Sequence, residues 1–306
     1  MQPTISKNWQ KEMNNTYHET VLLKEVIDSL HIEKDGKYID ATLGNGGHTL
    51  EILKAGGEVL GIEIDPEMLA IADKRLEKEV GKKGTCKLVQ GNFTDIDKIA
   101  AGCGWRDIDG ILFDLGVTNL HLKDLERGFS FENPEATLDM RMDPDAQGVK
   151  GSDLLNVLRE DQLRELFEMT LEPGAAKWIS GRVLHSREEK PIENVGDFLE
   201  ISQGLRIGKP GLNEATLPFL ALRIAVNSEI TNLEEVLPKA FSLLKKGGRL
   251  VVISFHSKED ALVKNFFKEM AKEGTKMITF KPITAGGEEL GVNRRARSAK
   301  MRVLEK

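Results

Sequence analysis

The sequence Lys37-Tyr-Ile-Asp-Ala-Thr-Leu-Gly-Asn-Gly-Gly-His48 passes from a short apolar run into a turn that holds three glycines. Glycine lets the backbone turn sharply and lets a ligand approach it closely. A helical pattern follows from about Thr49 to Lys54, and the amides at a helix start favour anionic or carboxylate groups. This strand, turn and helix therefore predict a site for a dinucleotide or for the methionine end of S-adenosylmethionine.

Two details separate these ligands. A dinucleotide fingerprint would carry a further glycine at the position of Thr49, and its pyrophosphate would usually not face a side chain as large as His48. The next apolar run ends in Glu63, a carboxylate that accepts ribose hydroxyls and suits either ligand. The missing glycine favours S-adenosylmethionine. A glycine turn without any ligand is the remaining alternative.

The chain beyond the turn alternates apolar runs with helical patterns, which indicates βαβ units and a parallel sheet. Strands are predicted at Glu58–Glu63, Lys87–Gln90 and Asp109–Leu115, with a helix that Pro66 opens. The third of these is apolar almost throughout, as a strand covered on both faces should be.

The alternation stops between about Thr118 and Leu217, where only loops and helices are predicted. The helices run from a cap at Ser152 to Leu166, from Ala175 to Ser186 and from Asp197 to Leu205. The sheet pattern resumes after Leu222, with a helix at Asn232–Leu244 ended by Gly247-Gly248, a strand at Arg249–Phe255, a helix at Lys258–Lys272 and a last strand pair ending at Met301–Leu304. We therefore predict an α/β domain formed by residues 1–118 and 222–306, with a helical domain inserted at residues 119–221.

Composition narrows the class of protein. No apolar run is long enough to cross a bilayer, and the first fifteen residues lack a secretory apolar segment, so a cytoplasmic protein is expected. Cys86 and Cys103 are predicted to be buried thiols, and no metal site is expected. The net charge of -6 argues against nucleic-acid binding by the whole surface. A local basic cluster near the C-terminus remains compatible with it.

Two further residues follow strand ends. Phe93 comes just after the predicted strand Lys87–Gln90, where it is an aromatic wall for an adenine or simply part of the core. Asp114 lies at the end of the predicted strand Asp109–Leu115, at the edge where open α/β sheets bind ligands. An aspartate after Ile111-Leu-Phe113 lies at a strand end or is costly to bury, so a function is favoured.

Eight blocks, taken together and in order from about His18 to Lys306, resemble the small-subunit rRNA (cytosine-N4)-methyltransferase H family, or MraW type. They are His18–Leu23, Asp40–His48, Asp109–Val117, Arg127–Phe131, Leu138–Asp143, Ala221–Ile224, Ile253–Ser257 and Arg297–Arg302. The resemblance implies a class I (Rossmann-like) S-adenosylmethionine-dependent methyltransferase domain with an inserted helical domain for substrate recognition. Its implied partner is 16S rRNA or the small ribosomal subunit; it leaves the oligomeric state open.

The resemblance also implies which residues contact the cofactor. They are Gly46, Gly47, His48, Glu63, Phe93, Asp114 and His121. The family usually has aspartate in place of Glu63 and glutamine in place of His121, and two serines where this chain has Thr118-Asn119. The first change keeps the carboxylate, whereas the second alters the hydrogen-bonding pattern.

Departures are larger in segments expected to face RNA. The chain has Leu171–Gly174, Leu217–Leu220 and Lys258–Ala261 where the family's usual motifs differ, and an arginine and a glutamine are lost. These changes keep two alternatives open: a methyltransferase with another RNA target, and a non-catalytic RNA-binding assembly factor that retains the cofactor pocket. A nicotinamide oxidoreductase is a weaker third reading.

Methylation of a cytosine N4 amine needs hydrogen-bond acceptors for its N–H groups, because its lone pair is delocalised into the ring. The candidates are Asp139, Asp114, Ser254 and His256. For Asp139 the alternative is a salt bridge with Arg141 or Arg127. Phe255 is either a stacking platform for the flipped base or part of the core. The expected phosphate contacts are Arg127, Arg141, Arg223, Arg294, Arg295, Arg297 and Lys300.

Overall fold

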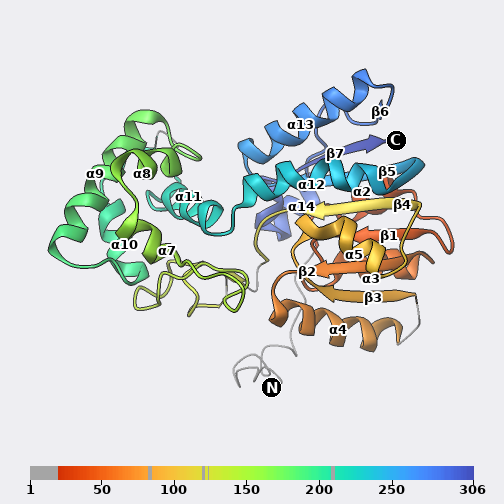
Figure 1. The fold of residues 1–306 in the computed structure, drawn as a ribbon, viewed down its shortest axis with the longest axis horizontal. Coiled ribbons are helices and arrows are strands. Elements are labelled where there is room, and N and C mark those ends of the chain that lie inside the picture. The colour runs from red at the N-terminus through yellow and green to blue at the C-terminus, as the bar shows by residue number, and fades with distance from the viewer. Residues whose placement is uncertain (1–19, 82–84, 119–120, 123, 208–210) are drawn as a thin grey trace. The chain divides into compact units, whose positions relative to one another are not determined.

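The computed structural model describes residues 20–81, 85–118, 121–122, 124–207 and 211–306, apart from the side chain of Arg294. Within these residues the chain forms two compact units (Figure 1). One consists of the chain up to Gly116 together with Ile230–Lys306, and the other of Val117–Glu229. The first holds the sheet and the second is helical, which confirms the predicted α/β class with a helical insertion.

The first unit is built on a seven-stranded sheet with the order β3-β2-β1-β4-β5-β7-β6. The strands are β1 (Lys37–Asp40), β2 (Glu58–Glu63), β3 (Cys86–Gln90), β4 (Ile108–Asp114), β5 (Leu244–Ser254), β6 (Lys276–Met277) and β7 (Lys300–Glu305). β1 to β5 pair in parallel, whereas β7 runs antiparallel to both of its neighbours. The carboxyl ends of the parallel strands therefore meet at one edge.

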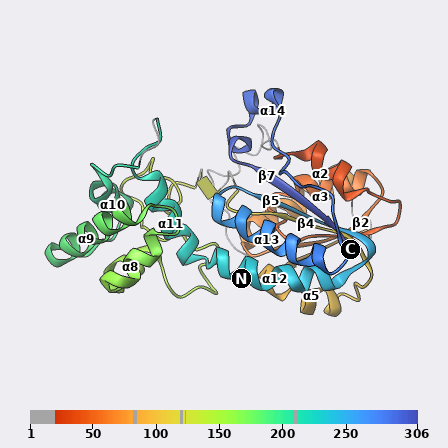
Figure 2. The same cartoon turned by 90° about the horizontal axis from the view of Figure 1, so that it is seen from above.

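Alternating side chains bury both faces of this sheet. Leu112, Val251 and Ile253 pack on one face with α2 (Leu23–Leu30) and α3 (Gly47–Lys54). Ile111 and Phe113 pack on the other face with α5 (Ile96–Gly102), α12 (Glu229–Leu243) and α13 (Ser257–Lys272). Figure 2 shows α2 and α3 on one side of the strands and α5, α12 and α13 on the other. This double burial explains the apolar strands in the sequence.

The remaining elements of this unit flank the sheet. They are α4 (Pro66–Val80), the 3-10 helix η1 (Phe93–Asp95), α14 (Gly287–Val292) and the 3-10 helix η2 (Arg294–Arg297). α4 begins with Pro66 in its first turn, and Asp65 caps it by accepting the N–H groups of Glu67 and Met68. None of the described helices combines the length and apolar character that crossing a bilayer requires.

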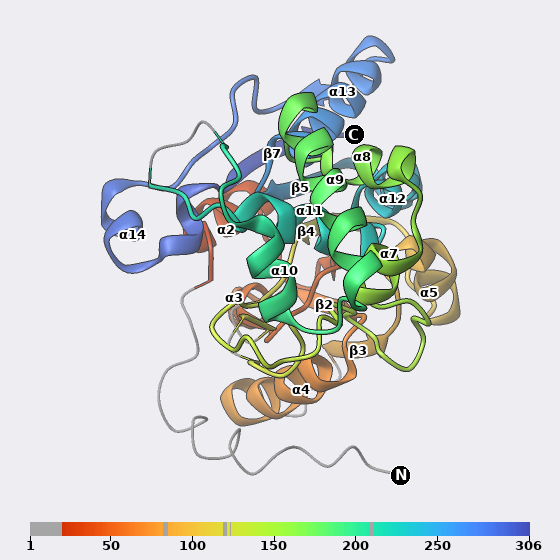
Figure 3. The same cartoon turned by 90° about the vertical axis from the view of Figure 1, so that its left-hand side faces the viewer.

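The second unit has its own core, and Figure 3 shows its helices gathered around one another. They are α7 (Gly151–Val157), α8 (Glu160–Phe167), α9 (Pro173–Glu189), α10 (Val195–Ser202) and α11 (Thr216–Val226). Phe167, Phe198 and Phe219 pack together in this core. The unit extends to Glu229, beyond the predicted limit at residue 221, because α11 packs against α7 and α8.

Two local predictions were wrong. Ser152 is buried inside α7 rather than capping it, and the single predicted helix is two helices, α7 and α8, because Leu158 adopts an extended conformation between them. Gly247-Gly248 lies inside β5 rather than ending a helix, at an irregularity in its pairing with β4. Gly247 has a φ of 82°, which explains the glycine there.

Candidate functional site

The glycine loop after β1 lies at the carboxyl edge of the sheet. Gly44 and Gly46 have φ angles of 53° and 76°, the left-handed region in which other residues are strained. Gly46 precedes α3, and Gly47 begins it. A Cβ atom at Gly47 would lie 2.1 Å from Oγ1 of Thr20, so that close approach needs glycine. The loop thus leads directly into the start of a helix, where backbone N–H groups favour an anion or a carboxylate.

Glu63 joins this loop to the end of β2. Its Oε2 accepts the N–H of Gly44 at 2.7 Å, and its Oε1 accepts the N–H of Asp65 at 2.9 Å. The side chain is nearly buried, and burial raises the pKa of the carboxyl to about 7, against the lowering effect of these two bonds. Each oxygen keeps a lone pair, so the carboxylate remains able to accept hydroxyl donors.

A buried hydrogen-bond chain connects the loop with β4. Asp40 accepts the Thr49 hydroxyl at 2.7 Å and the N–H of Thr42 at 3.3 Å. The hydroxyl oxygen of Thr42 in turn accepts the N–H of Asp114 at 2.6 Å. Burial raises the pKa of Asp40, while His48 and the Thr49 hydroxyl oppose it. Asp40 is therefore a positioning residue for both the glycine loop and Asp114.

Asp114 ends β4 beside His48, which lies in the first turn of α3. Oδ2 of Asp114 lies 3.9 Å from Nδ1 of His48, and the two side chains are 18% and 5% exposed. Oδ1 of Asp114 is buried and has no hydrogen-bond partner among the described residues. Burial raises the pKa of Asp114 to about 6, although the charge of Arg295 opposes this. A buried acceptor oxygen without a partner makes Asp114 a candidate for binding an N–H donor.

Phe93 lies in η1, just after β3, at the same edge. Its ring packs edge-on against Phe113 with the centroids 5.7 Å apart, and the residue is only partly buried. Asn92 caps η1 by accepting the N–H of Thr94. Phe93 therefore contributes to the core with one edge and leaves part of its surface accessible, so its role toward an adenine stays a prediction.

The end of β5 holds Ser254 and His256 in structural contacts. The Ser254 hydroxyl donates to the carbonyl of Lys300 at 3.2 Å. His256 caps α13, since its Nδ1 accepts the N–H of Glu259 at 3.4 Å. Its Nε2 is 3.2 Å from Oε1 of Glu259, but the alignment is too poor for a hydrogen bond. Both side chains thus have local roles that their position in the sequence did not reveal.

The basic residues near the C-terminus lie around η2 and β7. The guanidinium of Arg295 lies over the Phe255 ring, 5.1 Å from its centroid, and Arg297 is exposed. Lys300 is 3.6 Å from Asp260, which Arg302 also binds. The side chain of Arg294 is outside the described residues. Phe255 is half-buried and packs in the core, with the Arg295 guanidinium over its ring, and its role as a stacking platform for a base stays a prediction.

The predicted residues of the helical unit are engaged internally. Arg141 binds both carboxylate oxygens of Asp139, with Nε–Oδ1 at 2.6 Å and Nη2–Oδ2 at 2.7 Å. Burial raises the pKa of Asp139, but the hydrogen bonds and charge of Arg141 outweigh it, and the pKa lies below its usual value. Arg127 donates to the carbonyls of Arg141 and Met142, and Arg223 binds Glu229 with two bonds. The salt-bridge alternative for Asp139 is thus the one the structure contains.

His121 belongs to this helical unit as well. Its Nδ1 accepts the N–H of Thr118 at 3.1 Å, and its ring stacks at a tilt on Phe129. The neighbouring Asn119 lies outside the described residues. Because His121 and Asp114 belong to different units, the structure brings together Gly46, Gly47, His48, Glu63, Phe93 and Asp114, but it does not place His121 with them.

These residues fit S-adenosylmethionine. The N–H groups at the start of α3 suit a methionine carboxylate, and Glu63 offers acceptors to ribose hydroxyls. The partnerless Oδ1 of Asp114 suits an N–H donor. Sequence reasoning missed the hydrogen bonds of Asp40, Thr42 and Thr49, which position these groups, and the close approach of Thr20 to Gly47. Only the polar residues around the glycines, Asp40 and Thr42 among them, hinted at such a network.

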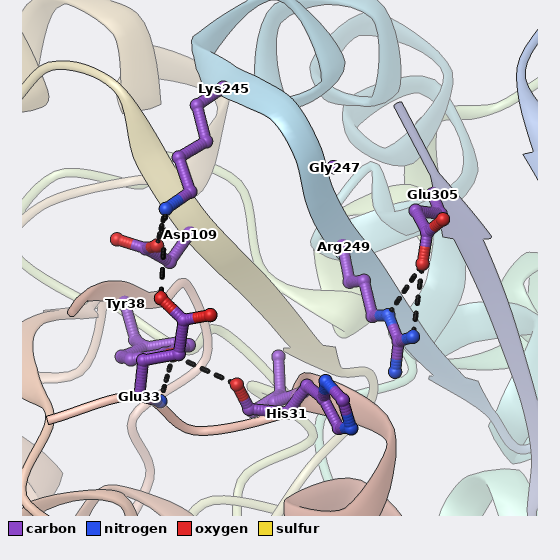
Figure 4. A pocket seen from close by; sticks show the side chains of 9 residues that line it. His31, Glu33, Tyr38, Asp109, Lys245, Gly247, Arg249 and Glu305 are labelled. Carbon is purple, nitrogen blue, oxygen red and sulfur yellow. Dashed lines mark hydrogen bonds and ion pairs between the residues drawn. The ribbon is translucent and has the colours of Figure 1, made fainter.

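A hollow of about 160 Å³ lies at the amino ends of the parallel strands β1, β4 and β5, opposite their carboxyl ends (Figure 4). Its charged side chains pair with one another: Lys245 contacts Asp109 and Glu33, and Arg249 binds Glu305. The Tyr38 hydroxyl accepts the N–H of Glu33 and donates to the carbonyl of His31. These contacts join the starts of β1, β4 and β5, so we assign the hollow a structural role.

Comparison with known proteins finds one family over nearly the whole chain. The model of the MraW methylase family matches residues 15–306. The chain is 40% identical over 314 aligned positions to the ribosomal RNA small subunit methyltransferase H of Methylacidiphilum infernorum, covering 98% of this chain and 97% of the relative. It is 40% identical to the protein of the same name from Heliobacterium mobile, covering 95% and 99%.

Similarity to solved structures is lower. A putative methyltransferase from Streptococcus mutans in complex with SAH is 15% identical, with a TM-score of 0.46 over 94% of this chain and 99% of that chain. An rRNA methylase from Streptococcus thermophilus is 11% identical, with a TM-score of 0.46 over 95% and 99%.

Proposed function

Because the chain belongs to the MraW methylase family, we propose that it transfers a methyl group to the N4 amine of a cytidine in 16S rRNA. It is an S-adenosylmethionine-dependent methyltransferase of small-subunit rRNA, as its family and its relatives indicate. The N4 position of cytosine is the specific part of the proposal. The observation that carries it is the buried Oδ1 of Asp114, which has no hydrogen-bond partner among the described residues.

S-adenosylmethionine supplies a methyl group on a positively charged sulfur. We assign its ribose to Glu63, its methionine end to Gly46, Gly47 and His48, and its adenine to Phe93. These residues lie at the ends of β1, β2 and β3, where open α/β sheets hold their ligands. His121 remains a proposed contact from the helical unit.

The acceptor of the target amine is best assigned to Asp114. An N–H that donates to a carboxylate raises the electron density on its nitrogen, and a fixed acceptor holds that nitrogen in position. The Ser254 hydroxyl donates to the carbonyl of Lys300, and Nδ1 of His256 accepts the N–H of Glu259, so their proposed role is to position the loop after β5. Asp139 is bound to Arg141, so we assign it to the stability of the helical unit.

For the RNA backbone we favour the C-terminal cluster. Arg295, Arg297 and Lys300 lie near the end of β5, with Arg294 beside them in sequence. Arg127, Arg141 and Arg223 donate to carbonyls and carboxylates within their own unit, which makes them weaker candidates for phosphate contacts. The proposed substrate implies a cytoplasmic enzyme whose helical unit recognises the RNA.

Methyl transfer with labelled S-adenosylmethionine tests the proposal. Small-subunit RNA, naked or assembled, should gain one labelled N4-methylcytidine, which mass spectrometry of its nucleosides detects. The same nucleoside should be missing from the rRNA of cells that lack the gene. Asp114→Asn should abolish the transfer and leave the circular dichroism spectrum unchanged. Label on another nucleoside would refute the N4 assignment, and donor binding without transfer to either substrate would favour the assembly factor.

The departures that suggested an assembly factor have structural explanations. Leu171 is buried, and Pro173 occupies the first turn of α9. Pro218 and Phe219 are buried in α11, where Phe219 joins the aromatic core. These residues therefore serve packing in the helical unit, and their change alone is no argument against catalysis.

A further inference from the structure

The contacts of His48 define which of its nitrogens carries hydrogen. Nε2 lies 3.0 Å from the carbonyl oxygen of Val21. A carbonyl oxygen only accepts hydrogen bonds, so Nε2 is protonated, and in the neutral ring Nδ1 is a lone-pair acceptor. Burial lowers the pKa of His48, against the raising effect of Asp40, which favours this neutral ring.

Nδ1 of His48 then faces a second acceptor. Oδ2 of Asp114 is 3.9 Å away, so a neutral His48 and an ionised Asp114 leave two lone pairs opposite each other. A single proton on Oδ2 would convert this contact into an O–H···N hydrogen bond once the two atoms move closer than 3.9 Å. The charged groups that act on the two side chains are Asp40, Glu259 and Arg295.

We propose that His48 and Asp114 form a pair that holds one proton between Nδ1 and Oδ2, and that this proton leaves when Oδ1 of Asp114 binds an amine. Without the proton, Asp114 is a full carboxylate and binds an N–H through a charge-assisted bond. With it, the carboxyl is neutral and the bond is weak. The inference rests on the proposed function, which brings two amines to the site.

These amines are the α-ammonium of the methyl donor and the exocyclic amine of the target base. If the base binds Asp114, the pair also takes up the proton that methylation releases. The methylated nitrogen is cationic, one of its N–H bonds breaks, an O–H bond forms on Asp114, and the proton then passes to solvent. His48 acts through Asp114 and is a positioning residue.

Nuclear magnetic resonance of the free enzyme tests the pair without any substrate. At pH 8 the ring nitrogens of His48 should show the Nε2–H form, and His48 and the Asp114 carboxyl carbon should titrate together. His48→Gln keeps an amide N–H for the Val21 carbonyl and removes the titrating nitrogen, so the Asp114 titration should move. Independent titrations, or an unchanged Asp114 in a folded His48→Gln enzyme, would overturn the proposal.

Calorimetry in buffers of different ionisation enthalpy identifies the amine. At pH 6, S-adenosylhomocysteine, which has the α-ammonium, should release up to one proton more than 5′-methylthioadenosine, which lacks it. Release common to both ligands reports Glu63. The excess should disappear in His48→Gln and persist in His185→Gln, a matched change at an exposed histidine of α9.

If the wild-type enzyme releases no more protons with S-adenosylhomocysteine than with 5′-methylthioadenosine, the amine that binds Asp114 is that of the target base. The pH profile of kcat must then show an inflection that depends on His48. Absence of both effects would overturn the proposal. A His48-dependent proton release by an enzyme that fails to methylate rRNA would leave the pair in place and refute only the proposed function.

Discussion

At the end of β2, Glu63 uses both carboxylate oxygens to hold backbone N–H groups of Gly44 and Asp65. An aspartate at this position would be one methylene shorter and could not reach in the same way without movement of the loop. The longer side chain thus serves two purposes, since it fixes the glycine loop and offers lone pairs to a ribose.

Removal of this carboxylate should weaken donor binding. Glu63→Ala is expected to lower the affinity for S-adenosylhomocysteine by about 1–3 kcal/mol, because two hydroxyls lose their acceptor. Isothermal titration calorimetry measures the loss. Glu51→Ala, on the outer side of α3, is the control and should bind as the wild type does. Equal affinity of Glu63→Ala and wild type would refute the ribose assignment.

The pH dependence of stability should report the same residue. The pKa of Glu63 is raised from 4.5 in the unfolded chain to about 7, so between these values the native state binds more protons. The free energy of unfolding attributable to Glu63 therefore falls as pH rises through this window, by an upper estimate of about 3 kcal/mol. Urea unfolding from pH 4.5 to 8 should show this fall in wild type and lose it in Glu63→Gln. Identical slopes would contradict the raised pKa.

Among the elements, the turn from β1 into α3 has the tightest steric requirement. Gly47→Ala should reduce donor affinity and the melting temperature, because its Cβ would meet Oγ1 of Thr20 at 2.1 Å. Thr20→Ala alone should have a small effect, and Gly47→Ala with Thr20→Ala should recover most of the loss. A double-mutant cycle by thermal unfolding measures the coupling. Additive effects would show that the contact is not the cause.

The salt bridge of the helical unit gives a prediction of another kind. Asp139→Asn should lower the free energy of unfolding by about 1–3 kcal/mol, since Arg141 loses two charged hydrogen bonds. Methyl transfer at a temperature where the variant is folded should fall far less than in Asp114→Asn. Asp161→Asn, in an exposed ion pair of α8, is the control for stability. If Asp139→Asn abolished methyl transfer and left the free energy of unfolding unchanged, Asp139 would be assigned a role in the reaction instead.

Local patterns predicted the strands well and the contacts around them poorly. The predicted strand Glu58–Glu63 has the bounds observed for β2 because its apolar run ends at a charged residue. The helices α2, α5, α11 and α14 were not predicted. Ser152 was predicted to be the N-cap residue of a helix, but Lys150 occupies the N-cap position of α7. The sequence around Asp139 is compatible with either a catalytic role or a salt bridge. Only the folded loop shows that Arg141 binds its carboxylate. Long-range contacts, such as Asp114 with Thr42, leave no trace in a single sequence.

At the scale of the whole molecule, two separate cores predict two unfolding events. The apolar clusters of the sheet unit and of the helical unit share no residue among those described. Calorimetric unfolding should resolve two transitions, and S-adenosylhomocysteine should raise only that of the sheet unit. At a concentration of 100 Kd the ligand adds about 2.7 kcal/mol to its stability. A single transition that shifts as a whole would show that the units unfold together.

The sheet unit is interrupted between β4 and β5, which pair along most of their length although Val117–Glu229 separates them in sequence. During synthesis, β4 leaves the ribosome well before its partner strand exists, and at about 5–20 residues per second the delay lasts roughly 6–26 s. An apolar strand with an open edge invites wrong pairing in that interval. The nascent chain therefore needs protection, by a chaperone or by early burial of β4 under α2, α3 and α5, until translation reaches β5.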